Sequence, residues 1–149
     1  MIGGIAELLA REAIRHTIAS YNHAGDRGRV AELAETFTPD GVLEVRRAGE
    51  PDNIDRAEGR SAIIEMLTAF VADGTTQRNA RTGSTRYVRH FVTGTHITLH
   101  ADRAEVASYF AVLTGHGLDH WGRYRDVLVP VHGRWLLSER IVWVDRQDG

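Results

Sequence analysis

The chain contains no cysteine among its 149 residues. This absence excludes disulfide bonds, thiolate catalysis and cysteine-ligated metal centres. An apolar run long enough to span a bilayer is also missing, and charged residues interrupt the apolar ones near the amino terminus, so no signal-peptide pattern forms. We therefore expect a cytoplasmic protein with no membrane partner.

An excess of basic charge is missing as well. The formal net charge is -2, whereas a surface that binds nucleic acid normally carries a clustered basic excess. Hydrophobic residues make up 42% and charged residues 26%, which is ordinary for a globular protein of a length that can bury a real core. No repeat or linker divides the sequence, so we expect one domain over residues 1–149 and no nucleic-acid partner.

Motifs for metals, phosphates and nucleophilic serines are likewise absent. The histidine pairs that could suggest a metal site are His96/His100, His116/His120 and His16/His23. The first two pairs are four residues apart, which on a strand separates the side chains by about 13 Å, too far to chelate one ion. The third pair is too widely spaced on a helix. Because no glycine-rich loop follows a predicted strand either, we expect no metal and no cofactor.

Apolar residues at helical spacing predict three helices, over residues 5–24, 27–37 and 61–71. Gly25 is expected to end the first helix in a left-handed conformation, and Asp26 is expected to cap the second. Thr38-Pro39-Asp40-Gly41 predicts a turn before a short strand over residues 41–47. Residues 48–58 and 73–84 are polar and rich in turn formers, and they are predicted to be loops.

The second half of the chain has the pattern of a β-sheet. Four segments are predicted to be long strands, over residues 85–99, 104–115, 120–132 and 134–145. The links between them are short, which favours antiparallel hairpins over parallel crossovers. Three helices followed by such a meander predict an α+β fold, in which helices cover one face of a curved sheet and leave a pocket at its wide end.

His90 is the first candidate functional residue. Alternation along its strand places it on one face with Val88 and Val92, while Tyr87 and Phe91 lie on the other. A histidine between two valines on a covered face is either a satisfied core residue or a catalytic base. The strand alone favours the core interpretation, so a catalytic role requires a partner elsewhere in the chain.

Several short sequences match the pattern of one known family. They are Tyr21-Asn22-His23-Ala24-Gly25-Asp26-Arg27-Gly28, Phe37-Thr38-Pro39-Asp40-Gly41, Gly59-Arg60-Ser61-Ala62-Ile63, His90-Phe91-Val92, Gly122-Arg123-Tyr124-Arg125-Asp126 and Gly133-Arg134-Trp135. In this order and spacing, from about residue 5 to 145, the chain resembles the SnoaL-like branch of the NTF2-like superfamily. The resemblance implies a cone-shaped α+β barrel of cystatin-like type, with a strongly curved, mostly antiparallel sheet covered by three amino-terminal helices.

The superfamily includes scytalone dehydratase, bile-acid dehydratase, lindane dehydrochlorinase, ketosteroid isomerase, polyketide cyclases and the small subunits of ring-hydroxylating dioxygenases. In the dehydratases and the dehydrochlorinase, an aspartate after the first helix orients a histidine that abstracts a proton. The resemblance assigns these roles to Asp26 and His90. It also matches Tyr21 to a pocket tyrosine that assists a leaving hydroxyl or a carbonyl oxygen, and Arg140 to an arginine on the last strand. Tyr21 is equally well explained as a core aromatic, and Asp26 as a helix cap.

Strand alternation suggests further pocket residues. Arg140 shares a face with Val142, and an inward arginine needs a carboxylate or an anionic substrate group as its partner. Arg123 and Arg125 share a face with Trp121, and we expect these three, with Val88 and Val92, to bind substrate. Within their own strands, Asp126 and Glu139 lie on the opposite faces from these arginines, and so are poor partners for them.

The fold alone does not determine the function. The first hypothesis is a cofactor-independent lyase or isomerase for a small hydrophobic or polycyclic substrate, with dehydration as the preferred reaction. The alternatives are a non-catalytic ligand-binding module and a structural subunit like that of the dioxygenases. We also expect a homo-oligomer, a dimer first and a trimer second, through apolar residues assigned to the outer sheet face: Tyr87, Phe91, Tyr109, Ala111, Leu113, Tyr124 and Leu128.

Overall fold

The computed structural model describes residues 3–71 and 88–147, in which three helices precede or interrupt a six-stranded sheet. The helices are α1 (Gly4–Asp26), α2 (Val30–Ala34) and α3 (Arg60–Phe70). The strands are β1 (Phe37–Arg47), β2 (Glu50–Glu58), β3 (Val88–Leu99), β4 (Ala104–Thr114), β5 (Gly117–Val131) and β6 (Arg134–Gln147). The predicted loop over residues 73–84 and the start of the strand at 85–87 lie outside the described residues. No helix in the described part of the chain is long and apolar enough to cross a membrane.

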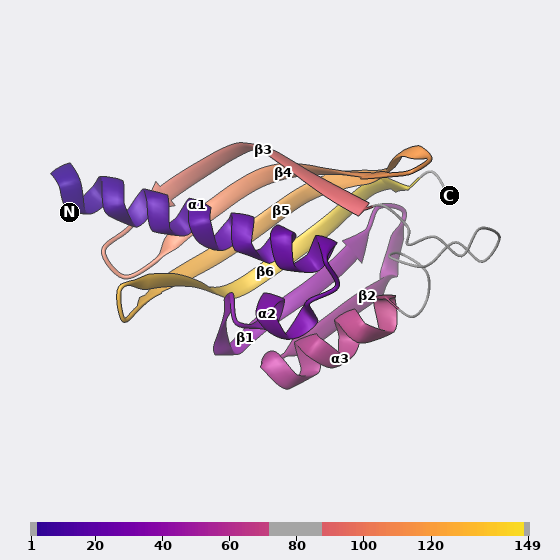
Figure 1. The fold of residues 1–149 in the computed structure, drawn as a ribbon, viewed down its shortest axis with the longest axis horizontal. Coiled ribbons are helices and arrows are strands. Elements are labelled where there is room, and N and C mark those ends of the chain that lie inside the picture. Colours follow the sequence, from indigo (N-terminus) through magenta and orange to yellow (C-terminus); the bar gives the residue numbers. More distant parts are fainter. Residues whose placement is uncertain (1–2, 72–87, 148–149) are drawn as a thin grey trace.

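The strands form one mixed sheet in the order β2-β1-β6-β5-β4-β3. The predicted meander of β3 to β6 is antiparallel throughout, and β1 joins it parallel to β6. The α+β class and the curved, mostly antiparallel sheet are therefore confirmed, and the helices lie against one face of the sheet (Figure 1). The sheet does not close into a barrel, because β2 and β3 remain as its two edges.

Helix α1 packs its buried side chains onto the sheet at helical spacing: Ala10, Ile14, Thr17, Ile18, Tyr21 and Asn22. Its first turns carry Ile5, Leu8 and Leu9, which are 75%, 67% and 66% exposed. These first turns extend past the strands of the sheet, at one end of the molecule (Figure 1). The part of α1 from Ala10 onward therefore supplies the residues that face the interior.

The end of α1 differs from the prediction. Gly25 remains helical, and a Cβ at this position would lie 3.3 Å from Leu33 Cδ1, so the glycine permits close packing of α2. The left-handed conformation occurs instead at Gly28, after the helix. Asp26 is the last residue of α1, and Arg29 occupies the N-cap position of α2. The predicted capping role of Asp26 is therefore wrong, which leaves its carboxylate available for another partner.

Most of the segment predicted to be a loop, residues 48–58, is the strand β2, which pairs antiparallel with β1. A strand at the edge of a sheet tolerates polar residues and a proline, since one side of its backbone needs no partner strand. Only Ala57 of β2 is buried. The predicted turn at Thr38-Pro39-Asp40-Gly41 lies within β1, where the pairing with β6 shifts between Phe37 and Val42. These residues thus form an irregularity in the strand and do not reverse the chain.

Candidate active site

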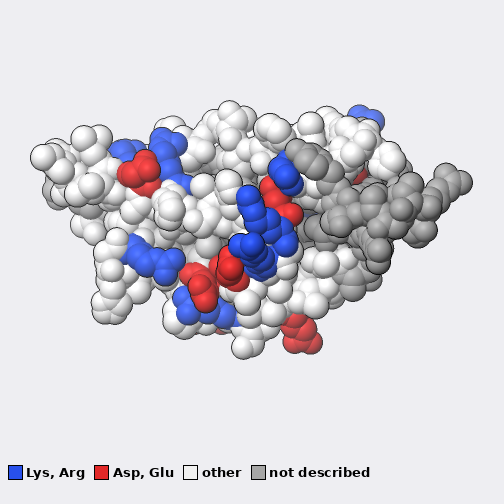
Figure 2. Space-filling model, in the orientation of Figure 1, with Lys and Arg blue, Asp and Glu red and all other residues white. Residues whose placement is uncertain are grey.

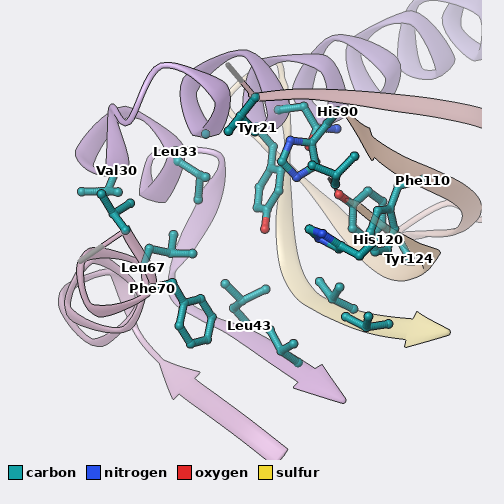
Figure 3. Close-up of a pocket in the computed structure, with 18 of the residues that line it drawn as sticks. Tyr21, Val30, Leu33, Leu43, Leu67, Phe70, His90, Phe110, His120 and Tyr124 are labelled. Carbon is teal, nitrogen blue, oxygen red and sulfur yellow. Dashed lines mark hydrogen bonds between the residues drawn. The ribbon is translucent and has the colours of Figure 1, made fainter. Parts of the chain in front are cut away.

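A cavity of about 220 Å³ lies between the helices and the inner face of the sheet. Most of its wall is apolar, and the aliphatic and aromatic side chains include Leu33, Leu43, Leu67, Phe70, Phe110 and Val142. The polar side chains around it come from α1, β1, β3 and β5, and they include Tyr21, Asn22, Arg47, His90 and His120. Tyr21, His90 and His120 project toward the same space (Figure 3). The composition of the wall suits a small, mainly apolar molecule with few polar groups.

Asp26 and His90 come together as the resemblance implied. Asp26 ends α1, and β3 begins two residues before His90, beside the end of this helix. Asp26 Oδ1 accepts from His90 Nδ1 at 2.5 Å, and Asp26 Oδ2 accepts from the His90 backbone N–H at 3.1 Å. The side chains are 8% and 23% exposed, respectively. One carboxylate therefore fixes both the backbone and the ring of His90.

The tautomer of His90 follows from the chemistry of its partner. An ionised carboxylate can only accept hydrogen bonds, so Nδ1 must carry the proton. In the neutral ring, Nε2 then has a lone pair and no proton, and it can accept a proton or a hydrogen bond. This is the arrangement that a general base requires, with its orientation set by a second residue.

Arg140 is inward-facing, as the alternation of β6 predicts, and it is completely buried. Its Nε and Nη2 donate to the two carboxylate oxygens of Asp126, each at 2.8 Å. The guanidinium also lies against two aromatic rings, 4.2 Å from the centroid of Tyr21 and 3.9 Å from that of Tyr124. Arg140 does not line the cavity, so the prediction that it contacts substrate directly is wrong. Its carboxylate partner lies across the strand pair, at the position directly opposite on β5.

This buried pair affects Tyr21, which lines the cavity together with Tyr124. Burial raises the pKa of Tyr21, and the positive charge of Arg140 opposes this rise. Burial disfavours the charged form of Arg140, but Asp126 more than offsets this effect and holds the pKa of Arg140 above its usual value. Tyr21 is therefore a protonated phenol at neutral pH and a hydrogen-bond donor, with a positive charge against its ring.

His120 is a pocket residue that the sequence prediction missed. It forms a second histidine–carboxylate pair, in which Asp119 Oδ2 accepts from His120 Nδ1 at 2.7 Å. Burial lowers the pKa of His120, the Asp119 hydrogen bond and charge oppose this, and the charge of protonated His90 lowers the pKa further. The adjacent Asp119 and the shared strand face of His120 with Tyr124 were the signals in the sequence that could have identified it.

Three residues predicted to bind substrate lie on the other face of the sheet. Trp121, Arg123 and Arg125 point outward, where the Arg146 guanidinium lies 6.0 Å from the Trp121 ring and Arg123 pairs with Asp145 at 3.4 Å. The prediction that they line the pocket is wrong.

The inner face of β5 carries the alternate residues: His120, Gly122, Tyr124, Asp126 and Leu128. Tyr124 and Leu128, which were assigned to the outer face, are thus buried. Since both faces of β5 carry apolar residues, an assignment shifted by one residue exchanges them.

The remaining predicted residues divide between two hollows. Val88 lines the cavity, whereas Val92 lines a shallower groove between α1 and β3. His90 and Asn22 line both. The amide nitrogen of Asn22 is buried without a hydrogen-bond partner among the described residues, while its Oδ1 accepts from the Tyr124 hydroxyl at 3.4 Å. Within residues 3–71 and 88–147, no three His, Asp or Glu side chains are grouped as metal ligands.

Comparison with protein families gives a match over most of the chain. A family model described as a SnoaL-like domain matches residues 6–141. No curated protein matches the sequence.

Solved structures that match include several with a cystatin-like or NTF2-like fold. A protein from Catenulispora acidiphila in complex with S-DNPA is 30% identical, with a TM-score of 0.72 over 90% of this chain and 92% of that chain. A candidate scytalone dehydratase from Novosphingobium aromaticivorans is 23% identical, with a TM-score of 0.73 over 95% and 88% of the two chains. A candidate beta subunit of an aromatic-ring-hydroxylating dioxygenase from the same organism is 17% identical, with a TM-score of 0.73 over 97% and 94%. The last two likenesses are of fold alone.

Proposed function

Because the chain belongs to the SnoaL-like domain family, we propose that it is a cofactor-independent lyase or isomerase whose base is His90. The observation that carries this proposal is that Asp26 accepts hydrogen bonds from both the ring and the backbone of His90, beside an apolar cavity. A base in such a cavity suits a small apolar substrate with an acidic C–H bond next to a carbonyl.

In the proposed reaction, the C–H bond breaks and its proton passes to His90 Nε2. The electron pair of that bond forms a C=C double bond, and the π pair of the carbonyl moves onto its oxygen to give an enolate. The Tyr21 hydroxyl donates a hydrogen bond to this oxygen. Asp26 stabilises the imidazolium that results. In a dehydration, the enolate then expels a β-hydroxyl group, which takes the proton from His90 and leaves as water. In an isomerisation, His90 returns the proton to another carbon.

Arg140 contributes to this scheme through Tyr21. The positive charge of Arg140 opposes the rise in the pKa of Tyr21, which makes the hydroxyl a stronger hydrogen-bond donor. It also stabilises the negative charge that develops on an adjacent oxygen. Arg140 is therefore proposed as a positioning and electrostatic residue, and Tyr21 as the group that touches the substrate.

The test is proton exchange on a simple apolar ketone. We would incubate the protein with 2-indanone in deuterated buffer and follow deuterium incorporation next to the carbonyl by NMR. We expect the wild type to accelerate exchange, His90→Gln to abolish the acceleration, and Asp26→Asn to reduce it by about 10²–10⁴-fold.

The matched control is His16→Gln, which changes an exposed histidine on α1 and should exchange like the wild type. If His90→Gln retains the wild-type rate while remaining folded, His90 is not the base.

A non-catalytic binding module is the second candidate. It is favoured by the Catenulispora acidiphila relative, which is described in complex with a small molecule, S-DNPA. A wild-type protein that binds 2-indanone without accelerating its exchange would support this candidate over the first.

A further inference from the structure

A second imidazole in the cavity wall, that of His120, is also held by a carboxylate. It lies near the start of β5, directly opposite Val112 of β4, and lines the same cavity as His90. Asp119 accepts the hydrogen bond from Nδ1, and the side chains of Asp119 and His120 are each 19% exposed. The Phe110 ring meets the imidazole edge to face, with centroids 5.9 Å apart. These contacts fix the orientation of a second imidazole that the proposed proton transfer does not use.

The hydrogen-bonding role of His120 follows from its partner. Because the Asp119 carboxylate can only accept, Nδ1 carries the proton. Burial lowers the pKa of His120, and a proton on His90 lowers it further, so the ring is neutral at neutral pH. Its Nε2 then has a lone pair and no proton, and can only accept a hydrogen bond from a molecule in the cavity.

The surroundings of His120 restrict what that molecule can be. The neighbouring wall residues Phe110 and Val112 offer no polar group. Arg47, also in the cavity wall, already pairs with Asp55 at 2.8 Å. A carboxylate on the ligand would find no donor at His120 and would be repelled by Asp119, whereas a hydroxyl group would supply the missing donor.

We propose that His120 accepts a hydrogen bond from a hydroxyl group of the substrate, and that the substrate is an apolar molecule bearing a hydroxyl on the side facing β5. The identification of this molecule as a substrate rests on the proposed function, but the hydroxyl recognition does not. His120 is thus a specificity-determining residue, distinct from the base.

The test compares two probes that differ in one hydrogen-bond donor, 2-naphthol and 2-methoxynaphthalene, by calorimetry or fluorescence titration. One neutral hydrogen bond predicts that the wild type binds 2-naphthol about five- to tenfold more tightly. His120→Phe keeps an aromatic ring but removes the acceptor, so the ratio of the two affinities should fall to about one, with 2-methoxynaphthalene affected little.

Two further variants test whether a changed preference results from loss of the acceptor or from damage to the fold. His120→Gln places a carbonyl oxygen near the position of Nε2 and should restore part of the preference. His116→Phe introduces the same ring at an exposed site in the turn between β4 and β5 and should leave the preference unchanged. Equal affinities in the wild type, or a preference for 2-naphthol that survives in folded His120→Phe, would overturn the proposal.

The two proposals fail separately. His90→Gln should lose the exchange of 2-indanone but retain the preference for 2-naphthol, because the acceptor at His120 remains. If 2-indanone exchange is absent in the wild type but the naphthol preference depends on His120, the recognition stands and the enzymatic proposal falls.

Discussion

Three carboxylates determine how the polar side chains of the inner sheet face are oriented. Asp26 fixes His90, Asp119 fixes His120, and Asp126 fixes Arg140. Since a carboxylate only accepts, each pairing decides which nitrogen donates and which atoms remain for other partners. The cavity wall therefore has two imidazoles with defined tautomers, and burial keeps its two tyrosines, Tyr21 and Tyr124, protonated.

The Asp126–Arg140 pair makes a specific prediction about stability. Removing one partner of a fully buried ion pair leaves an uncompensated charge, so Arg140→Met should lower the free energy of unfolding by about 3–5 kcal/mol in urea titrations. Replacing both partners, with Asp126→Leu and Arg140→Met, should recover much of the loss.

The matched control is Arg123→Met, since Arg123 forms an exposed pair with Asp145 on the outer face. It should change the free energy of unfolding by less than about 1 kcal/mol. Similar losses in the Arg140 and Arg123 variants would show that burial of the inner pair has no energetic consequence.

The pKa of His120 predicts a pH dependence of stability. In the folded protein this pKa is lowered from its usual value of 6.5, mainly by burial, so between the two values the unfolded chain binds more protons. The free energy of unfolding therefore falls as the pH falls below about 6.5. Wild type should lose more stability than His120→Gln between pH 7.5 and 5.5 in urea titrations, and His116→Gln should behave like the wild type. A loss of equal size in His120→Gln would contradict the lowered pKa.

At the scale of elements, an irregularity in strand pairing lies next to the site. The pairing of β5 with β6 shifts between Trp121 and Gly122, next to His120. At this point the two backbones approach so closely that a Cβ on Gly122 would lie 1.8 Å from the carbonyl oxygen of Trp143. No side chain fits there, so the glycine sets the local path of β5 between His120 and Tyr124.

Gly122→Ala should consequently be costly. We expect the free energy of unfolding to fall by about 3 kcal/mol or more, because the backbone of β6 must move to admit a methyl group. Gly115→Ala is the matched control, since nothing lies within 4 Å of a Cβ there, and it should change stability by less than about 1 kcal/mol. If the Gly122→Ala variant is as stable as the Gly115→Ala variant, β5 and β6 do not approach in this way.

The regularity of the apolar pattern explains which elements the sequence could predict. Periodicity identified α1, α3 and the four strands of the meander, because each is long and has a regular apolar pattern. It missed β2, which is an edge strand with polar residues, and it reversed the faces of β5, where both faces carry apolar side chains. Asp26 and His90 were identified through the resemblance, whereas His120 and the Asp126–Arg140 pair depend on which face of β5 points inward.

At the scale of the whole molecule, charge is mixed and not segregated. Arginine and acidic side chains lie close together on the face shown in Figure 2, where red side chains border the blue group near the centre. The outer face of the sheet carries two large exposed side chains on neighbouring strands, Phe91 at 57% and Tyr109 at 62% exposed. Exposed aromatic groups on a sheet surface are typical of association sites.

We therefore expect a homodimer that buries Phe91 and Tyr109. Light scattering after size exclusion should give twice the chain mass at micromolar concentration, and Phe91→Ser with Tyr109→Ser should give a monomer. Leu8→Ser with Leu9→Ser, which changes exposed apolar residues of α1, should leave the dimer intact. A monomeric wild type would contradict this expectation.

The most direct measurement of the central claim is the protonation of the two ring nitrogens of His90, read from their ¹⁵N chemical shifts at a pH where the imidazole is neutral. If Asp26 orients the ring as a base, Nδ1 is protonated and Nε2 is not in the wild type, and Asp26→Asn shifts the proton population toward Nε2. If the nitrogen shifts of His90 are the same in both proteins, the carboxylate does not set the tautomer, and the dyad does not exist in solution.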